Sequence, residues 1–173
     1  MNLSISGGVK LEKFQPFSGM ITIINDFWVN STGENLGCYK LMSLTNGFGS
    51  LINFVVSPNT YFVDHVTMNI GDMVTAFYDV NAPAPLIFPP QFRAIVMAKN
   101  TQNENVKVDH FNSELVSSDN QLKLNIGPST QILLENGQAF TQNPANRNLI
   151  VIYGPTTRSI PAQTTPYEII VMC

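Results

Sequence analysis

The sequence predicts an all-β protein of two tandem small barrel or sandwich units, OB-like and related by an internal duplication. Short apolar runs rich in β-branched and aromatic residues follow one another along the 173-residue chain, separated by Asn, Gly and Pro turn signals. A strand, a proline-rich segment and a second strand follow each other at residues 78–98 and again at 153–172. Because proline fixes φ and lacks an N–H, these proline segments predict extended crossovers rather than helices or central strands.

The composition excludes several classes of function. Charged residues make up 12% of the chain, about half the usual quarter, and the net charge is −3. Nucleic acid is therefore an unlikely partner, since sequence-independent binding needs clustered Lys and Arg. No apolar run reaches the length of about 18 residues that a membrane span needs, so no membrane insertion is expected. Low charge gives little electrostatic protection against self-association.

The start of the chain lacks the basic and apolar regions of a signal peptide. We therefore expect a cytoplasmic protein, or one released by lysis onto a spore or cell surface. Residues 1–18 are interpreted as an N-terminal leader, part of which alternates like a strand. Residues 15–19 predict a turn after it.

The first β unit is predicted at residues 19–101. An Asn46-Gly47 pair between apolar runs is a strong hairpin signal, because both positions accept a positive φ. The expected strands of this unit are 20–29, 38–44, 51–56, 60–63, 73–78 and 92–98.

The second β unit is predicted at residues 102–173, after a polar linker at 99–104. Its expected strands are 106–111, 122–126, 131–134, 148–153 and 167–172. No helical pattern longer than two turns interrupts either unit, and strands at this spacing indicate small barrels or sandwiches.

Three matches in the same order indicate that the units arose by duplication. Residues 56–60 match 126–130, residues 77–78 match 152–153, and residues 92–97 match 167–172. The last two matches share one sequence offset, that of the tyrosines Tyr78 and Tyr153. The long first hairpin and the later Gly71-Asp72 turn are typical of an OB-type barrel, although a short segment, 60–69, stands where that fold has a helix.

Several of these motifs resemble known sequences. The runs at 57–61, 71–74, 77–79 and 84–92 are similar to uncharacterised duplicated β-barrel (OB-like) proteins of clostridia and related Gram-positive bacteria. The resemblance covers most of the chain after residue 19. It implies a lineage, and it implies neither an activity nor catalytic residues.

No pattern of a catalytic, metal or cofactor site is present, so no enzymatic activity, no metal and no cofactor are expected. The Asp64-His65 and Asp109-His110 pairs fall at non-equivalent places in the two units. No Cys or Glu spacing supports a metal cage around them, and ordinary loop and strand-end histidines are the favoured interpretation.

The function predicted from these observations is that of a structural, self-associating protein of a bacterial surface or spore layer. Strand addition by the leader to a neighbouring copy is the expected contact. The competing interpretation is that the leader pairs within its own unit. Two unpaired, reduced cysteines are favoured, while an intermolecular bond through the terminal cysteine remains an alternative. The residues expected to mediate assembly are Leu3, Ile5, Val9, Leu11, Phe14 and Cys173.

The alternative function is a carbohydrate- or oligonucleotide-binding module that uses the aromatic residues of the first unit, with a glycan as a possible partner. Rings on barrel strands can stack on sugars or bases. Aromatic residues at strand spacing are, however, more often part of the core. The candidate ligand platform consists of Trp28, Tyr39, Phe54 and Tyr61.

Overall fold

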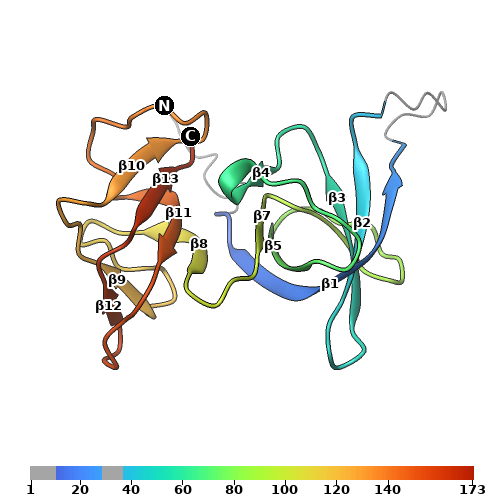
Figure 1. The fold of residues 1–173 in the computed structure, drawn as a ribbon, viewed down its shortest axis with the longest axis horizontal. Coiled ribbons are helices and arrows are strands. Elements are labelled where there is room, and N and C mark those ends of the chain that lie inside the picture. The colour runs from blue at the N-terminus through green and yellow to red at the C-terminus, as the bar shows by residue number, and fades with distance from the viewer. Residues whose placement is uncertain (1–10, 29–36) are drawn as a thin grey trace, which may run out of the picture. The chain divides into compact units, whose positions relative to one another are not determined.

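The computed structural model describes residues 11–28 and 37–173, and within them every regular element is a strand except one 3-10 turn, Val63–His65. This confirms the all-β prediction. The chain forms two compact units, residues 1–99 and 100–173 (Figure 1). Unit 1 contains β1 (Phe14–Asp26), β2 (Lys40–Thr45), β3 (Leu51–Val56), β4 (Tyr61–Phe62), β5 (Met73–Asp79), β6 (Gln91–Arg93) and β7 (Val96–Lys99). Unit 2 contains β8 (Asn105–Phe111), β9 (Leu122–Leu124), β10 (Gln131–Leu134), β11 (Arg147–Tyr153), β12 (Ala162–Thr164) and β13 (Glu168–Val171).

In unit 1 the seven strands form one sheet, in the order β4-β7-β5-β1-β2-β3-β6. The first half of β1 pairs with β5 and its second half with β2, and its register to β2 shifts between Ile21 and Ile23. Gly19 lies where the partner changes. A Cβ at this position would lie 2.8 Å from the carbonyl oxygen of Thr45, so the close approach of the two strands requires glycine.

Residues 15–19, predicted as a turn, lie inside β1, and that prediction is wrong. Pro16 is opposite Phe77 of β5. The carbonyl of Phe77 accepts a hydrogen bond from the Ile95 N–H on the other side of β5, so Pro16 and Phe77 exchange no hydrogen bonds. A proline fits this position because its missing N–H removes no ladder bond. Residues 14–18, assigned to the leader from the sequence, are thus paired within unit 1.

A single stretch of chain connects the outer parts of the unit 1 sheet. β6 pairs in parallel with β3, β7 pairs in antiparallel fashion with β5, and only Ala94 and Ile95 separate them. The Ala94 N–H donates to the Val55 carbonyl at 2.9 Å, and the Ile95 N–H donates to the Phe77 carbonyl at 2.8 Å. The sheet therefore curls around one core. That core contains the buried residues Ile21, Met42, Leu44, Phe54, Val56, Met68, Val74, Ala76, Tyr78, Ala94 and Met97.

Unit 2 is divided into a four-stranded sheet, β10-β13-β11-β8, and a two-stranded sheet, β12-β9. The sheets are arranged as a short β-solenoid and not as barrels, so the predicted tandem barrels are wrong. The two units differ where unit 1 has its long β1–β2–β3 meander. At the corresponding place unit 2 has two isolated bridges, Phe111 with Ser117 and Val116 with Lys123. Its core consists of Phe111, Leu122, Leu124, Leu149, Val151, Ile169 and Val171.

The units repeat one another at the level of single hydrogen bonds. In unit 1 the buried hydroxyl of Thr60 accepts from the Ser57 N–H at 3.0 Å and donates to the Ala94 carbonyl at 2.7 Å. The next residue, Tyr61, then donates its N–H to the Ile95 carbonyl. This threonine therefore fixes the turn after β3 against the start of β7.

Thr130 makes the same contacts in unit 2. Its hydroxyl accepts from the Gly127 N–H at 3.2 Å and donates to the Pro166 carbonyl at 2.7 Å. The next residue, Gln131, donates its N–H to the Tyr167 carbonyl. The predicted match of residues 56–60 with 126–130 is thereby supported by equivalent backbone geometry.

The predicted match of the last strands is wrong in register. Ile95 donates its N–H to the Phe77 carbonyl, and Tyr167 donates its N–H to the Ile152 carbonyl. Phe77 therefore corresponds to Ile152 as predicted, whereas Tyr167 corresponds to Ile95 and not to Phe92. The crossover of unit 2 is shorter by three residues. A register shift by an odd number of residues exchanges the two faces of a strand. Both strands are apolar on both faces, so the sequence does not reveal this shift.

Replacing the hydroxyl of Thr60 tests this shared bonding. We expect Thr60→Val to lower the free energy of unfolding by about 2 kcal/mol, because the Ser57 N–H and the Ala94 carbonyl lose their buried partner. The matched Thr60→Ser variant keeps the hydroxyl and is expected to lose less. The measurement is the urea midpoint followed through Trp28, the single tryptophan of the chain. Equal losses in the two variants would show that the methyl group, not the hydroxyl, is what matters.

Candidate functional site

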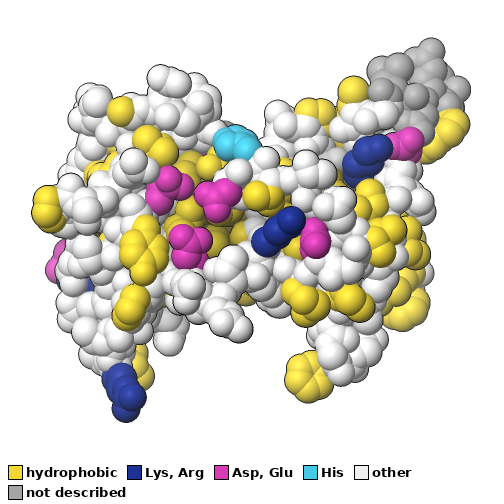
Figure 2. Space-filling model, viewed as in Figure 1, with side chains coloured by type: hydrophobic (Ala, Val, Ile, Leu, Met, Phe, Trp, Pro, Cys, Tyr) yellow, Lys and Arg dark blue, Asp and Glu magenta, His cyan; other side chains and the backbone are white. Residues whose placement is uncertain are grey.

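Two loops of unit 1 present large apolar side chains to solvent. In the proline crossover between β5 and β6, Leu86 is fully exposed, Ile87 is 54% exposed and Phe88 is 89% exposed. In the β2–β3 hairpin, Phe48 is 95% exposed. We call these four side chains the apolar tip. Figure 2 shows hydrophobic side chains reaching the surface of this unit.

The sheet register brings the two loops to the same end of unit 1. β3 and β6 run in parallel, with Asn53 opposite Gln91. Phe48 precedes Asn53 by a few residues and Phe88 precedes Gln91, so both loops enter their strands from the same edge. Neither loop, 46–50 or 80–90, contains a charged residue. Both loops are candidates for an interaction surface, because large exposed apolar side chains mark such surfaces.

A groove lies beside the crossover. It consists of two cavities of about 310 Å³ and 220 Å³, both lined by Pro83, Phe92 and Arg93. The larger cavity is also lined by Glu12, Asn59, Asp79, Ala82, Ala94 and Ile95. The smaller cavity is also lined by Phe27, Tyr39, Val55, Ser57, Pro85 and Gln91. We call the two together the Arg93 groove.

Phe92 gives the groove a rigid aromatic wall. Its ring is stacked on that of Tyr78, with the centroids 4.3 Å apart and an angle of 20° between the planes. Tyr78 in turn packs against Phe54 at 5.7 Å, and Phe54 against Phe17 at 6.2 Å. Because one face of Phe92 is held by this stack, its position is fixed while the side chain remains partly exposed to the groove.

The cavities that Phe92 lines also have hydrogen-bond donors and acceptors in their walls. The exposed guanidinium of Arg93 makes a long hydrogen bond of 3.4 Å from Nη2 to the Ser57 hydroxyl. The Oδ1 atom of Asp79, which lines the larger cavity, accepts hydrogen bonds from the backbone N–H groups of Lys13 and Asn81, each at 2.9 Å. These two backbone bonds orient the carboxylate of Asp79 at the rim of the larger cavity.

The structure distributes the predicted platform residues over different environments. Tyr39 lines the groove, and the exposed Trp28 follows Phe27, whose N–H donates to the Tyr39 carbonyl. Phe54 is fully buried in the core, so its assignment to a ligand platform is wrong. Tyr61 belongs to β4 and packs against the ring of His65 at 5.6 Å.

The predicted assembly residues are also dispersed. Leu3, Ile5 and Val9 lie outside the described residues. Leu11 is exposed, and Phe14 begins β1, where it pairs with Asp79 of the same unit. Cys173 and Cys38 are both exposed, and neither forms a disulfide bond in the described part of the chain.

The residues that the sequence analysis missed are the apolar tip together with Phe92 and Arg93 of the groove. For the tip a signal was present: an apolar run, 86–88, between prolines that exclude a buried strand. For Phe92 and Arg93 no local signal existed, because their roles follow from the pairing of β6 with β3.

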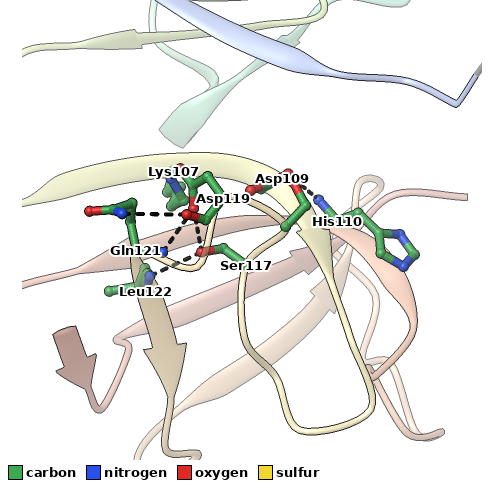
Figure 3. A network of polar contacts seen from close by, with 8 residues as sticks. Lys107, Asp109, His110, Ser117, Asp119, Gln121 and Leu122 are labelled. Atoms are coloured by element: carbon green, nitrogen blue, oxygen red, sulfur yellow. Dashed lines mark hydrogen bonds and ion pairs between the residues drawn. The ribbon is translucent and has the colours of Figure 1, made fainter. Parts of the chain in front are cut away.

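Neither Asp-His pair forms a reactive arrangement. Asp64 and His65 lie in the 3-10 turn, both with positive φ. Asp109 is buried and accepts the His110 N–H at 2.8 Å and the Ser118 hydroxyl at 2.5 Å. The ring of His110 points away from that carboxylate (Figure 3). Among the described residues no group of three or more His, Cys, Asp or Glu could hold a metal ion.

A second carboxylate of unit 2, Asp119, is the centre of a structural network (Figure 3). It accepts from Lys107 Nζ at 2.6 Å, from the Ser117 hydroxyl at 2.6 Å and from the Gln121 N–H at 3.1 Å. Burial raises the pKa of Asp119, but these three hydrogen bonds and the charge of Lys107 together outweigh it and lower the pKa below the usual value. The network fixes the loop between β8 and β9.

No family model, no curated protein and no solved structure matches the chain. The resemblance to clostridial proteins therefore stays a prediction. No helix in the part of the chain that the structure describes is long and apolar enough to cross a membrane.

The lowered pKa of Asp119 makes a pH dependence testable. A carboxylate whose pKa is lower in the folded state stabilises the fold above its unfolded-state pKa, and this contribution is lost as the pH falls through the folded-state pKa. We expect Asp119→Asn to be less stable than the wild type at pH 7 by about 1 kcal/mol or less, because the ion pair is partly exposed. The difference should shrink in acid, as urea midpoints at pH 7 and pH 3 would show. The exposed Glu104→Gln is the control, and a constant difference at both pH values would contradict the assignment.

Proposed function

We propose that this is a structural, self-associating protein and that its copies meet through the apolar tip of unit 1. The observation that carries the proposal is the near-complete exposure of Leu86 and Phe88 on a crossover without charge. Apolar surface contributes about 25 cal/mol per Å² when it is removed from water, so leaving this tip in water is unfavourable. A protein contact that covers the apolar tip would remove this unfavourable exposure.

A second copy of the chain is the occupant that the composition favours. The tip carries no charge that would select a charged partner, and only 12% of the chain is charged, so copies repel each other weakly. Four such side chains would bury roughly 600 Å² on each copy, somewhat less than the share of about 800 Å² in a standard interface. The association is therefore expected to be weak at one contact and to depend on concentration.

Unit 2 offers a related feature that suits repeated contacts. In the register that matches Ile95 with Tyr167, Ile160 corresponds to Phe88, and it is 78% exposed. Each chain then carries an apolar side chain at the equivalent crossover of both units. Two contact points on one molecule permit open assemblies such as a surface or spore layer, in which many weak contacts act together.

The apolar tip replaces the leader as the proposed contact. Residues 14–18 pair with β5 of their own unit, which favours the interpretation that this part of the leader completes its own sheet. Strand addition by the residues before position 11 is a separate route, and it is distinguished from the tip by deletion.

The experiment measures molar mass by light scattering over a range of protein concentrations, with and without reductant. The wild type should grow in mass with concentration, and the double variant Leu86→Ser/Phe88→Ser should remain monomeric. Ile70→Ser, an exposed apolar residue on another turn of unit 1, is the matched control and should behave as the wild type. Deletion of residues 2–10, which precede β1, should leave association through the tip intact. A wild-type protein that stays monomeric at high concentration, with and without reductant, would contradict the proposal.

A further inference from the structure

We propose that the Arg93 groove of unit 1 binds a saccharide, with a sugar ring stacked on Phe92 and sugar hydroxyls bonded to Arg93 and Asp79. This is a function separate from self-association, since the groove and the apolar tip use different side chains.

The aromatic wall supplies the stacking surface. Phe92 lines both cavities, while its other face is held against Tyr78 at 4.3 Å. The ring is thereby ordered before a ligand arrives, so binding costs little side-chain entropy. The negative face of such a ring attracts the weakly positive C–H groups that one face of a sugar ring presents. Phe27 and Tyr39 add two further rings to the smaller cavity.

The polar groups fit hydroxyls, which both donate and accept hydrogen bonds. Arg93 offers N–H donors, and its only hydrogen bond within the described part of the chain is the long one to Ser57. Asp79 offers carboxylate oxygen, and both hydrogen bonds recorded for it go to Oδ1, from the backbone of Lys13 and Asn81. A site that has both donors and acceptors suits a neutral polyhydroxyl ligand.

The charges favour a saccharide over an oligonucleotide. A phosphate chain is bound by several Lys and Arg side chains, and Arg93 is the one cationic residue among those recorded as lining the groove. Glu12 and Asp79 line the larger cavity and would repel phosphates. The chain as a whole has a net charge of −3.

The groove belongs to unit 1 alone, which fixes the stoichiometry. In the register that matches Ile95 with Tyr167, Phe92 corresponds to Thr164 and Arg93 to Thr165. Unit 2 thus keeps the backbone arrangement but has neither the ring nor the guanidinium. One saccharide should bind to each chain.

The test is a titration of the full chain, followed by Trp28 fluorescence and by calorimetry. The probes are a panel of mono- and oligosaccharides of glucose, galactose, mannose and N-acetylglucosamine, and single-stranded oligonucleotides. Trp28 is adjacent to Phe27 of the groove, and it is the only tryptophan. We expect a saturable response to at least one saccharide, with one site per chain.

The variants locate the site. Arg93→Gln and Tyr39→Ala should each weaken binding by about tenfold or more, as the loss of a charge-assisted hydrogen bond or of a stacking ring implies. Arg158→Gln changes an exposed arginine of unit 2 and should bind as the wild type. The double variant Leu86→Ser/Phe88→Ser should also bind normally, which separates this proposal from self-association. Three results would each overturn the proposal: no binding of any saccharide, saturable binding of oligonucleotides alone, or binding by Arg93→Gln as tight as by the wild type.

Discussion

The stretch from Gln91 to Lys99 is the constraint on which the rest of unit 1 depends. It must pair with β3 at one end and with β5 at the other, and the two N–H groups between β6 and β7 satisfy both neighbours in turn. Buried backbone groups without partners are costly, so the chain has little freedom in how it passes from one strand to the other. That passage determines the direction of Phe92 and Arg93. The groove is therefore a consequence of how the sheet connects its outer strands.

The proline crossover that leads into this stretch explains the second surface. Prolines prevent the crossover from adding a strand, so its apolar side chains have no sheet face against which to pack. Leu86 and Phe88 are consequently exposed, whereas Pro83 and Pro85 of the same segment form part of the groove wall. One stiff segment thus contributes to both surfaces. Because such a segment loses little entropy on binding, it can present apolar side chains at low cost.

The sequence predicted the strands well because β-branched runs and Asn, Gly and Pro signals are local. The wrong predictions concern features that depend on residues far apart in the sequence. Pro16 resembles a turn residue until its pair with Phe77 is known, and the register of the last strands depends on the length of a loop whose ends look alike in both units. For the candidate site, Tyr39 and Phe92 line the groove while Phe54 is buried, and sequence spacing could not separate these environments. That distinction is made by the curl of the sheet.

Comparison of the units separates the contacts that both share from the side chains that only unit 1 has. Thr60 of unit 1 and Thr130 of unit 2 each donate a hydrogen bond from the hydroxyl to a backbone carbonyl just before the last strand of the unit. Because both units have this bond, it is part of the fold. Unit 2 has threonines in place of Phe92 and Arg93, and two isolated bridges in place of the long meander. Its polar loop is instead ordered by the network around Asp119. The rings and guanidinium of the groove are therefore the residues whose presence the fold alone does not explain.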